Sequence, residues 1–346
     1  MLTRYKKVGL ETSSLCQLKC HSCPRASGAT EPVIGNGYLR LNDITKLLDD
    51  NQGIKELELS NYGEIFTNPD LSDIIEEGFK RNVALTADNG VNLNTVSDEV
   101  LEGLVKFRFR SITISIDGAS NHTYGLYRHG GNYETVINNV IRLNSYKEQY
   151  RSKYPLLTWQ FVVFGHNEHE LTAARTLAHE MHMRFYAKLS WDGVFSPVRN
   201  REAIRRVLGA ASRAEYRERY SVDYSRGICN QLWEQPQINW DGKVLGCCRN
   251  FWGDFGGNAF TDGLARSLNS EKMQYARAML TGRQGFRDDI PCASCQIYLD
   301  MKANGTWLKR GFRRWVVSVI SPATRRAVKN LSNEDGRFRL MKVFHS

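Results

Sequence analysis

Between residues 6 and 190, short β-prone runs alternate six times with stretches of helical periodicity. The β-prone runs lie near residues 7–12, 55–60, 82–88, 111–117, 158–164 and 183–190. The stretches between them place apolar residues at i, i+3 and i+4, most clearly in 41–50, 70–81, 97–107, 132–149 and 167–183. Neighbouring parallel strands need a crossover connection, so this α/β alternation predicts a parallel sheet covered by helices. An open doubly wound sheet and a partly closed barrel both satisfy the pattern.

Three of the eight cysteines follow the first predicted strand directly. Cys16, Cys20 and Cys23 have the spacing CxxxCxxC. Ligands of parallel α/β folds bind at the carboxyl ends of the strands, where this loop is expected to lie. Three thiolates can hold a four-iron cluster and leave one iron open for a substrate or cofactor. A zinc knuckle is the alternative, although a closed structural zinc site needs four ligands.

The other five cysteines lie in a second, smaller module that follows a helix-prone connector at residues 193–226. They are Cys229, Cys247, Cys248, Cys292 and Cys295. A probable hairpin at 238–246 turns on an Asp-Gly pair and brings the cysteines on its two sides together. Four thiolates complete a second cluster, which leaves one cysteine spare. Zinc suits four thiolates equally well, and spacing alone does not separate the two metals.

Several motifs in this order resemble the radical S-adenosylmethionine (radical SAM) superfamily. They are the CxxxCxxC loop, "SNYGEIFTNPDL", "TADNG", "TISIDG" and "YRHGGNYETV". The resemblance implies a partial (β/α)6 TIM barrel, with Cys16, Cys20 and Cys23 holding a 4Fe-4S cluster that binds SAM. It further implies cofactor-binding roles for Tyr62, Gly63, Glu64, Asn89, Ser115, Asp117 and Arg128. Within these, backbone groups near Tyr62 receive the methionine amino group and Arg128 its carboxylate. Turn or cap chemistry is the alternative for Asn89, Ser115 and Asp117.

The second module resembles the twitch domain, a shortened SPASM domain found in many radical SAM enzymes. This resemblance assigns Cys229, Cys247, Cys292 and Cys295 to an auxiliary 4Fe-4S cluster and leaves Cys248 free. It divides the chain into a radical SAM core at 1–215, a small α+β twitch/SPASM-like cluster domain at 216–304, and a basic C-terminal tail at 305–346. An auxiliary cluster with four protein ligands has no site for substrate, so its expected use is to carry electrons.

The resemblance also implies a reaction. Reductive cleavage of SAM gives a 5'-deoxyadenosyl radical, which removes a hydrogen atom from a substrate C–H. Members with this cysteine layout dehydrogenate aminocyclitols, so we expect oxidation or epimerisation of a sugar or aminocyclitol carbinol. Arg184 and Lys188 share a strand face and are candidates for the base, with a salt bridge as the alternative. Cys248 is a candidate hydrogen-atom donor for epimerisation, with simple apolar packing as the alternative.

The charge distribution limits the classes of binding partner that the sequence supports. Of the formal net charge of +10, residues 305–346 carry +8, so a nucleic-acid role suggested by charge rests on the tail alone. The tail could instead contact an anionic membrane surface or pack on the barrel. No signal-peptide pattern opens the chain, and we expect a cytoplasmic protein that receives electrons from a flavodoxin or ferredoxin. A ribosomal peptide is the alternative substrate. A nucleic-acid-binding protein with structural metals is the alternative function.

Overall fold

The computed structural model describes residues 5–309, so most of the predicted basic tail lies outside the described residues. Residues 1–306 group into one compact unit, and the fold below is that of the described part of this unit. The proposed boundary between residues 215 and 216 stays a prediction.

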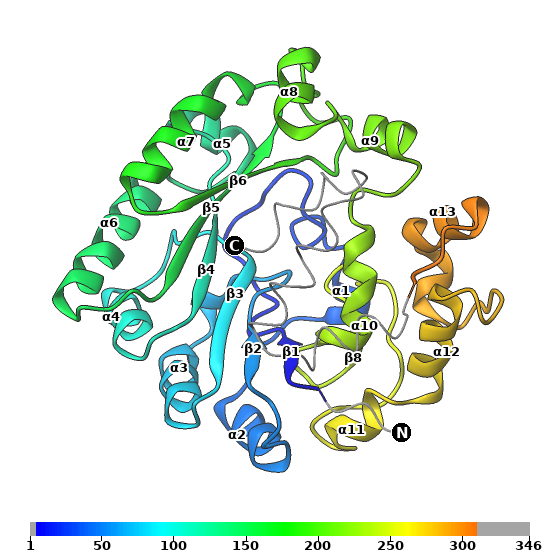
Figure 1. The fold of residues 1–346 in the computed structure, drawn as a ribbon. Coiled ribbons are helices and arrows are strands. Elements are labelled where there is room, and N and C mark those ends of the chain that lie inside the picture. Colours follow the sequence, from blue (N-terminus) through cyan, green and yellow to red (C-terminus); the bar gives the residue numbers. More distant parts are fainter. Residues whose placement is uncertain (1–4, 310–346) are drawn as a thin grey trace, which may run out of the picture. The chain divides into compact units, whose positions relative to one another are not determined.

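The core of this unit is a single eight-stranded sheet with the order β6-β5-β4-β3-β2-β1-β7-β8. Its first six strands are parallel and confirm the six predicted runs: β1 (Lys7–Leu10), β2 (Glu56–Glu58), β3 (Ala84–Val91), β4 (Ser111–Ser115), β5 (Leu156–Val163) and β6 (Arg184–Leu189). β6 and β8 form the two edges, so the sheet is curved but not closed (Figure 1). Of the two architectures that the alternation allowed, the chain adopts the partial barrel.

Helices cover the outer side of this sheet (Figure 1). The five that the periodicity predicted are α2 (Leu41–Asp50), α3 (Leu71–Lys80), α4 (Asp98–Lys106), α6 (Tyr133–Gln149) and α7 (Leu171–Glu180). In α3 the buried side chains Leu71, Ile74 and Ile75 have the i, i+3, i+4 spacing of a face packed on strands. Three short helical elements that were not predicted lie in the connections: α1 (Glu31–Ile34), α5 (Asn121–Tyr127) and η1 (Ile65–Thr67). The short η2 (Glu168–Glu170) directly precedes α7 and belongs to the stretch 167–183 that was predicted to be helical.

The central strands are largely buried, as parallel strands in this class usually are, whereas the edge strand β6 is mostly half-buried. In β5, Trp159, Phe161 and Val162 are all fully buried. Burial of each such side chain stabilises the fold by roughly 1.5–3 kcal/mol. Polar side chains inside these strands are therefore exceptions that need an explanation, and several of them belong to the site described below.

The C-terminal module continues the barrel sheet. Its hairpin strands are β7 (Gln237–Ile238) and β8 (Val244–Gly246); β7 pairs parallel with β1 and antiparallel with β8. This confirms the Asp-Gly hairpin and adds a pairing that sequence did not predict. The remaining elements are α8 (Arg201–Leu208), α9 (Arg213–Tyr220), η3 (Arg226–Asn230), α10 (Gln231–Glu234), α11 (Leu264–Ser267), α12 (Glu271–Leu280), η4 (Pro291–Ser294) and α13 (Gln296–Asn304).

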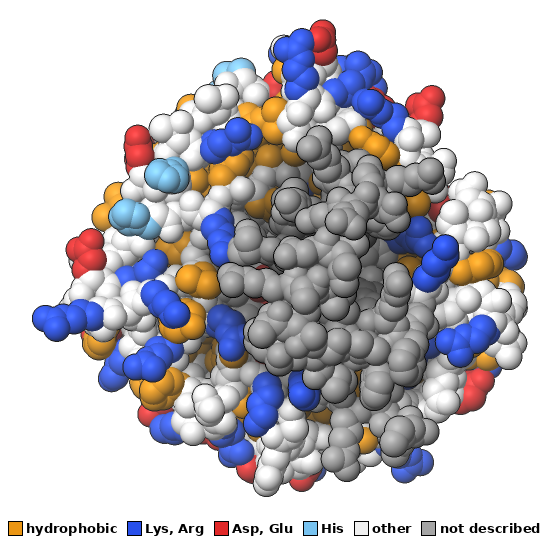
Figure 2. Space-filling model, viewed as in Figure 1, with side chains coloured by type: hydrophobic (Ala, Val, Ile, Leu, Met, Phe, Trp, Pro, Cys, Tyr) orange, Lys and Arg blue, Asp and Glu red, His pale blue; other side chains and the backbone are white. Residues whose placement is uncertain are grey.

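The apolarity of the helices and the distribution of surface charge bear on whether the described residues could contact a membrane or a nucleic acid. In residues 5–309, none of the helices has the length and apolarity needed to cross a membrane. Figure 2 shows the Lys and Arg side chains on one face spread around its periphery and interspersed with Asp and Glu. The described side chains that are visible on this face therefore do not form a single basic stripe of the kind that is typical of nucleic-acid interfaces.

Candidate active site

The loop that carries the first three cysteines lies at the barrel mouth, between β1 and α1. It is held against the end of α5 by backbone bonds from Lys19 N to His129 O (3.0 Å) and from His21 N to Tyr127 O (3.3 Å). Its cysteines share an apolar cluster formed by Leu18, Cys20, Tyr127, Val162 and Phe164, with Cys16, Cys23 and Phe195 packed against it. The structure thus brings the three thiols together in a water-poor environment.

This environment suits thiolates that bind metal. Burial, together with the nearby carboxylate of Glu64, raises the pKa of Cys16 to about 12. Burial also raises the pKa of Cys20. Desolvated thiols of this kind keep their protons unless a cation replaces them, so metal binding and deprotonation are coupled. The donor set, three soft sulfurs in an apolar cradle, fits an iron-sulfur cluster.

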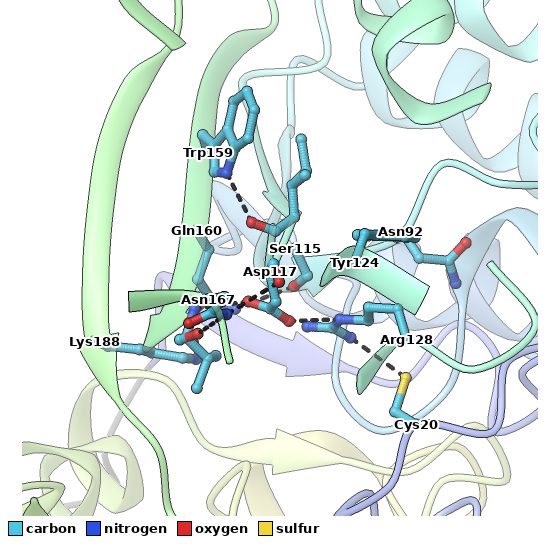
Figure 3. A network of polar contacts seen from close by, with 12 residues as sticks. Cys20, Asn92, Ser115, Asp117, Tyr124, Arg128, Trp159, Gln160, Asn167 and Lys188 are labelled. Atoms are coloured by element: carbon cyan, nitrogen blue, oxygen red, sulfur yellow. Dashed lines mark hydrogen bonds and ion pairs between the residues drawn. The ribbon is translucent and has the colours of Figure 1, made fainter. Parts of the chain in front are cut away.

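Asp117 and Arg128 connect this loop to the rest of the mouth (Figure 3). Asp117 lies just past β4 and is fully buried, and its carboxylate accepts from Arg128 Nε (2.7 Å) and from Val162 N (2.7 Å). Arg128, at the C-cap of α5, also donates from Nη1 to Cys20 Sγ (3.6 Å). Three predicted site residues therefore form one chain of contacts from β4 to the cysteine loop.

The segment predicted to receive the SAM amino group lies beside the cysteine loop. One oxygen of the buried Glu11 accepts hydrogen bonds from both Tyr62 N and Gly63 N, each at 2.9 Å. A Cβ on Gly63 would lie 2.0 Å from Ser13 O, so only glycine allows the loops after β1 and β2 to approach this closely. Among the described residues, no hydrogen bond uses the carbonyl oxygen of Tyr62 or of Gly63.

Two acids at this point, Glu11 after β1 and Glu64 after β2, are buried. Glu64 is 2% exposed and accepts from Asn92 N (2.7 Å), while Asn92 Nδ2 donates to Cys16 Sγ (3.8 Å). Burial raises the pKa of Glu64 to about 7 and that of Glu11 likewise to about 7. Glu64 therefore connects the cysteine loop, through Asn92, to the end of β3.

A line of polar side chains crosses three neighbouring strands (Figure 3). Lys188 Nζ in β6 donates to Gln160 Oε1 in β5 (2.7 Å), and Gln160 Nε2 donates to Ser115 Oγ in β4 (3.1 Å). Burial lowers the pKa of Lys188 to about 8; Arg213 and Arg128 also lower it, and Asp117 partly opposes them. Ser115 thus reaches Lys188 through Gln160, which the sequence analysis did not identify.

Asn89 and Arg184 have different surroundings. Asn89, in β3, donates from its backbone N to Ser60 Oγ (3.0 Å) and from Nδ2 to Ser60 O (2.6 Å). Gly90 follows at φ +118°, and a Cβ there would lie 2.6 Å from Ser115 Oγ, so a glycine is required for β3 to pass β4 at this point. Arg184 is exposed at the amino end of β6, and the structure does not bring it to Lys188 or to the mouth.

The second set of cysteines lines one pocket. These cysteines are Cys229 of η3, Cys247 just after β8, Cys292 of η4 and Cys295 at the N-cap of α13. Apolar side chains complete the wall, among them Leu232, Trp252, Phe255, Leu280 and Tyr298. Burial raises the pKa of Cys247 to about 12. The structure thus brings together the four cysteines that the twitch/SPASM resemblance selected.

The spread of these thiols bears on the choice of metal. Within residues 5–309, no three His, Cys, Asp or Glu side chains lie close enough together to hold a single metal ion. A tetrahedral zinc site needs four sulfurs about 2.3 Å from one point. Four thiols that line one pocket suit a four-iron cluster, in which each cysteine binds a different iron.

Tyr62 links the two cysteine sites. Its phenol donates to Arg249 O (2.6 Å), in the loop that begins with Cys247, and its ring meets Phe251 edge-on with centroids 5.6 Å apart. Cys248 lies in the same loop, is partly buried, and donates its backbone N–H to Gln231 Oε1 (2.8 Å). Burial raises the pKa of Cys248 to about 11. The spare thiol and the SAM-type loop therefore share one region.

Sequence reasoning missed Glu11 and Gln160. Both are polar residues inside strand-like apolar runs, "KVGLET" and "TWQFVVF". A polar side chain in a strand buried on both faces needs a partner, and this is the signal that would have identified both residues.

Comparison with known proteins supports an iron-sulfur module in the C-terminal part of the chain. Residues 229–296 match the SPASM family, described as an iron-sulfur cluster-binding domain, and all four pocket cysteines lie in that range. No curated protein sequence matches the chain.

Solved structures share the fold at low sequence identity. Streptococcus suis SuiB bound to S-adenosylmethionine aligns with a TM-score of 0.60 and 14% identity, over 86% of this chain and 72% of that chain. SuiB bound to the precursor peptide SuiA aligns with a TM-score of 0.57 and 14% identity, over 86% and 71%. BtrN in complex with AdoMet and 2-DOIA aligns with a TM-score of 0.49 and 13% identity, over 86% and 94%. The partial barrel and the iron-sulfur module that the motifs predicted are both confirmed.

Proposed function

We propose that this chain, which has the fold of the radical SAM enzymes followed by a SPASM iron-sulfur domain, oxidises or epimerises a carbinol C–H of a sugar or aminocyclitol. The observation that carries the proposal is the pair of thiol sites at one barrel mouth. Three cysteines lie on the loop after β1, four line the SPASM pocket, and Tyr62 contacts the loops of both.

Cys16, Cys20 and Cys23 would hold the first 4Fe-4S cluster, and Cys229, Cys247, Cys292 and Cys295 the second. With SAM bound, the first cluster supplies the electron that releases methionine and the 5'-deoxyadenosyl radical, which removes a hydrogen atom from the substrate. The apolar cluster around Cys20 excludes water from this step. A flavodoxin- or ferredoxin-type protein is the proposed source of the electron.

Two groups of this chain are placed to orient SAM. The carbonyl oxygens of Tyr62 and Gly63, free of hydrogen bonds among the described residues, are suitable acceptors for the methionine ammonium group. Arg128 is the proposed partner of the methionine carboxylate, because Asp117 engages only its Nε and Cys20 its Nη1. The ion pair with Asp117 fixes the guanidinium plane before SAM arrives.

Lys188 is the proposed acceptor of the substrate hydroxyl proton. Burial lowers its pKa to about 8, so roughly a tenth of the lysine is neutral and basic at pH 7, far more than for an exposed lysine. Its hydrogen bond to Gln160 fixes its position against β5. Arg184, exposed at the far end of β6, has no proposed part in this step.

The proposed oxidation balances as follows. The carbinol carbon would lose a hydrogen atom to the deoxyadenosyl radical and its hydroxyl proton would pass to Lys188; a cluster held by Cys229, Cys247, Cys292 and Cys295 would accept the remaining electron, which leaves a ketone. In the epimerase variant, the hydroxyl keeps its proton and Cys248 would return a hydrogen atom to the opposite face of the carbon; the thiyl radical left on Cys248 would regain its thiol with a proton and one electron from the flavodoxin- or ferredoxin-type donor. Its location in the loop contacted by Tyr62 supports this second outcome.

A peptide substrate is the second candidate, because the structurally similar SuiB was solved with its precursor peptide SuiA. The two candidates differ in the source of the abstracted hydrogen. Reconstituted enzyme is therefore supplied with SAM, dithionite and either carbon-deuterated sugars and aminocyclitols or deuterated peptides. We expect deuterium in 5'-deoxyadenosine only with a carbinol-deuterated cyclic substrate; transfer only from peptides would replace the first candidate by the second.

A further inference from the structure

Three cationic side chains converge beside the proposed catalytic region without a counter-ion. Lys188 belongs to β6, Arg213 is the first residue of α9, and Arg249 lies in the loop after β8. All three are partly buried. Among residues 5–309, none of them forms an ion pair with a carboxylate. We call these three residues the cation cluster.

The contacts of Arg213 are all with neutral groups. Its Nε donates to Leu189 O (3.1 Å), its Nη1 donates to Ser225 Oγ (2.7 Å), and its guanidinium lies over the Tyr224 ring, 4.8 Å from the centroid. These contacts fix the guanidinium next to the carboxyl end of β6 while leaving its charge uncompensated.

The side chains of Lys188 and Arg249 likewise have no carboxylate partner in the described part of the chain. Lys188 donates to the neutral amide of Gln160 (2.7 Å) and lies 5.8 Å from the centroid of Trp191. The guanidinium of Arg249 has no hydrogen-bond partner in the described part of the chain; only its backbone oxygen is engaged, by Tyr62.

The members of the cluster lie within each other's electrostatic fields. Burial lowers the pKa of Arg213, and Arg249 is among the groups that lower it further. The acids nearest to the cluster are already paired: Asp223, near Arg213, with Arg217 (3.4 Å), and Asp117, near Lys188, with Arg128 (2.7 Å). Like charges held near one another in a partly buried region repel, and this repulsion costs free energy. A bound anion would remove this cost.

We propose that Arg213 and Arg249 bind a phosphate group of a phosphorylated sugar and so hold its carbinol beside Lys188. The inference rests on the proposed function and narrows its substrate class. A phosphate presents three oxygens and up to two negative charges, so it can form bidentate hydrogen bonds with two guanidinium groups and balance both of their charges, whereas a carboxylate carries one charge. An unmodified aminocyclitol, which carries an ammonium group, would be repelled by the same arginines.

Binding of a simple anion tests the site without knowledge of the whole substrate. The probe is inorganic pyrophosphate, with malonate as a dicarboxylate of similar size, titrated calorimetrically into the reconstituted full-length protein with SAM and no reductant. The test variant is Arg213→Gln/Arg249→Gln. The control is Arg206→Gln/Arg266→Gln, which removes two exposed arginines and the same net charge. Because the basic tail at 305–346 can bind polyanions in every variant, the readout is the difference between variants.

We expect pyrophosphate to bind at least tenfold more weakly to the test variant than to wild type, and the control to stay within about twofold, a tenfold change being about 1.4 kcal/mol. Equal affinities in the test and control variants would overturn the inference. Malonate binding to wild type as tightly as pyrophosphate would overturn the choice of phosphate.

Two checks keep the result interpretable. Iron and sulfide contents must match wild type; if the double variant loses iron because Arg249 neighbours Cys247, Arg213→Gln alone is compared with Arg206→Gln, with at least a threefold loss expected. SAM cleavage is measured separately with reductant. If SAM is cleaved normally but the test and control variants bind pyrophosphate equally well, the phosphate site is refuted and the proposed function stands. If the test variant binds pyrophosphate more weakly but wild type does not cleave SAM, the phosphate site stands and the proposed function is refuted.

Discussion

The ion pair between Asp117 and Arg128 connects the barrel to the cysteine loop. The substitution Asp117→Asn tests how much this pair contributes to the free energy of unfolding. Asp117 is fully buried and the Arg128 side chain is 14% exposed, so the amide leaves a guanidinium charge with little solvent around it. Breaking a buried pair by removal of one charge costs about 3–5 kcal/mol. Asparagine keeps one acceptor oxygen, and this places the expected loss near the lower end, about 3 kcal/mol.

The assay is anaerobic urea unfolding of holoprotein with matched iron content, followed by tryptophan fluorescence. Asp49→Asn is the matched control, because Asp49 pairs with Arg81 at the surface and is 59% exposed; its loss should stay below about 1 kcal/mol. Arg128→Met and the double variant complete a cycle, with an expected coupling above about 1.5 kcal/mol. A loss below about 1 kcal/mol for Asp117→Asn at unchanged m, or a coupling near zero, would refute the reasoning.

Three further predictions concern other parts of the mouth. Gly63→Ala places a methyl group 2.0 Å from Ser13 O and should abolish deoxyadenosine formation, whereas Gly53→Ala, with nothing within 4 Å, should leave it unchanged; equal activities would contradict the close approach of the two loops. Lys188 must be neutral to accept a proton, and its pKa is lowered to about 8, so kcat/KM should rise with pH and level off above about pH 8. Lys188→Gln should remove this rise, and a retained rise would assign it to another group. Tyr62→Phe removes one hydrogen bond to the SPASM-domain loop, about 1 kcal/mol, and should raise the ratio of deoxyadenosine to product at unchanged iron content; an unchanged ratio would show that the two sites do not communicate through this contact.

The sequence predicted most of the fold because its signals are local. The six strands and five long helices each carry their own hydrophobic periodicity, and the structure differs from the predicted runs mainly at their ends. The pairing of β7 with β1 joins segments more than 200 residues apart and leaves no local pattern. The same holds for the short α5, whose N-cap Ser120 accepts from Thr123 N but whose seven residues lack a long apolar stripe.

The residues of the candidate site likewise fall into those that the sequence could identify and those that it could not. Motif spacing selected Cys16, Cys20 and Cys23, which lie at short intervals, and the twitch/SPASM resemblance selected the four cysteines that the structure places around one pocket. Single polar residues such as Glu11 and Gln160 gave no spacing to recognise, and their importance follows only from the contacts that they make. Arg184 shows the opposite limit: strand parity put it on the same face as Lys188, but four residues of strand separate the two by roughly 13 Å.

The most direct test of the account is the product formed from SAM by the anaerobically reconstituted protein after reduction by dithionite. Wild type should contain about eight irons per chain, by the ligand count, and release 5'-deoxyadenosine and methionine. The variant with Cys16, Cys20 and Cys23 all replaced by Ala should keep about four irons and release neither product. Deoxyadenosine formation that survives in this variant, or its absence from fully loaded wild type, would contradict the central claim that these three thiols hold the cluster that cleaves SAM.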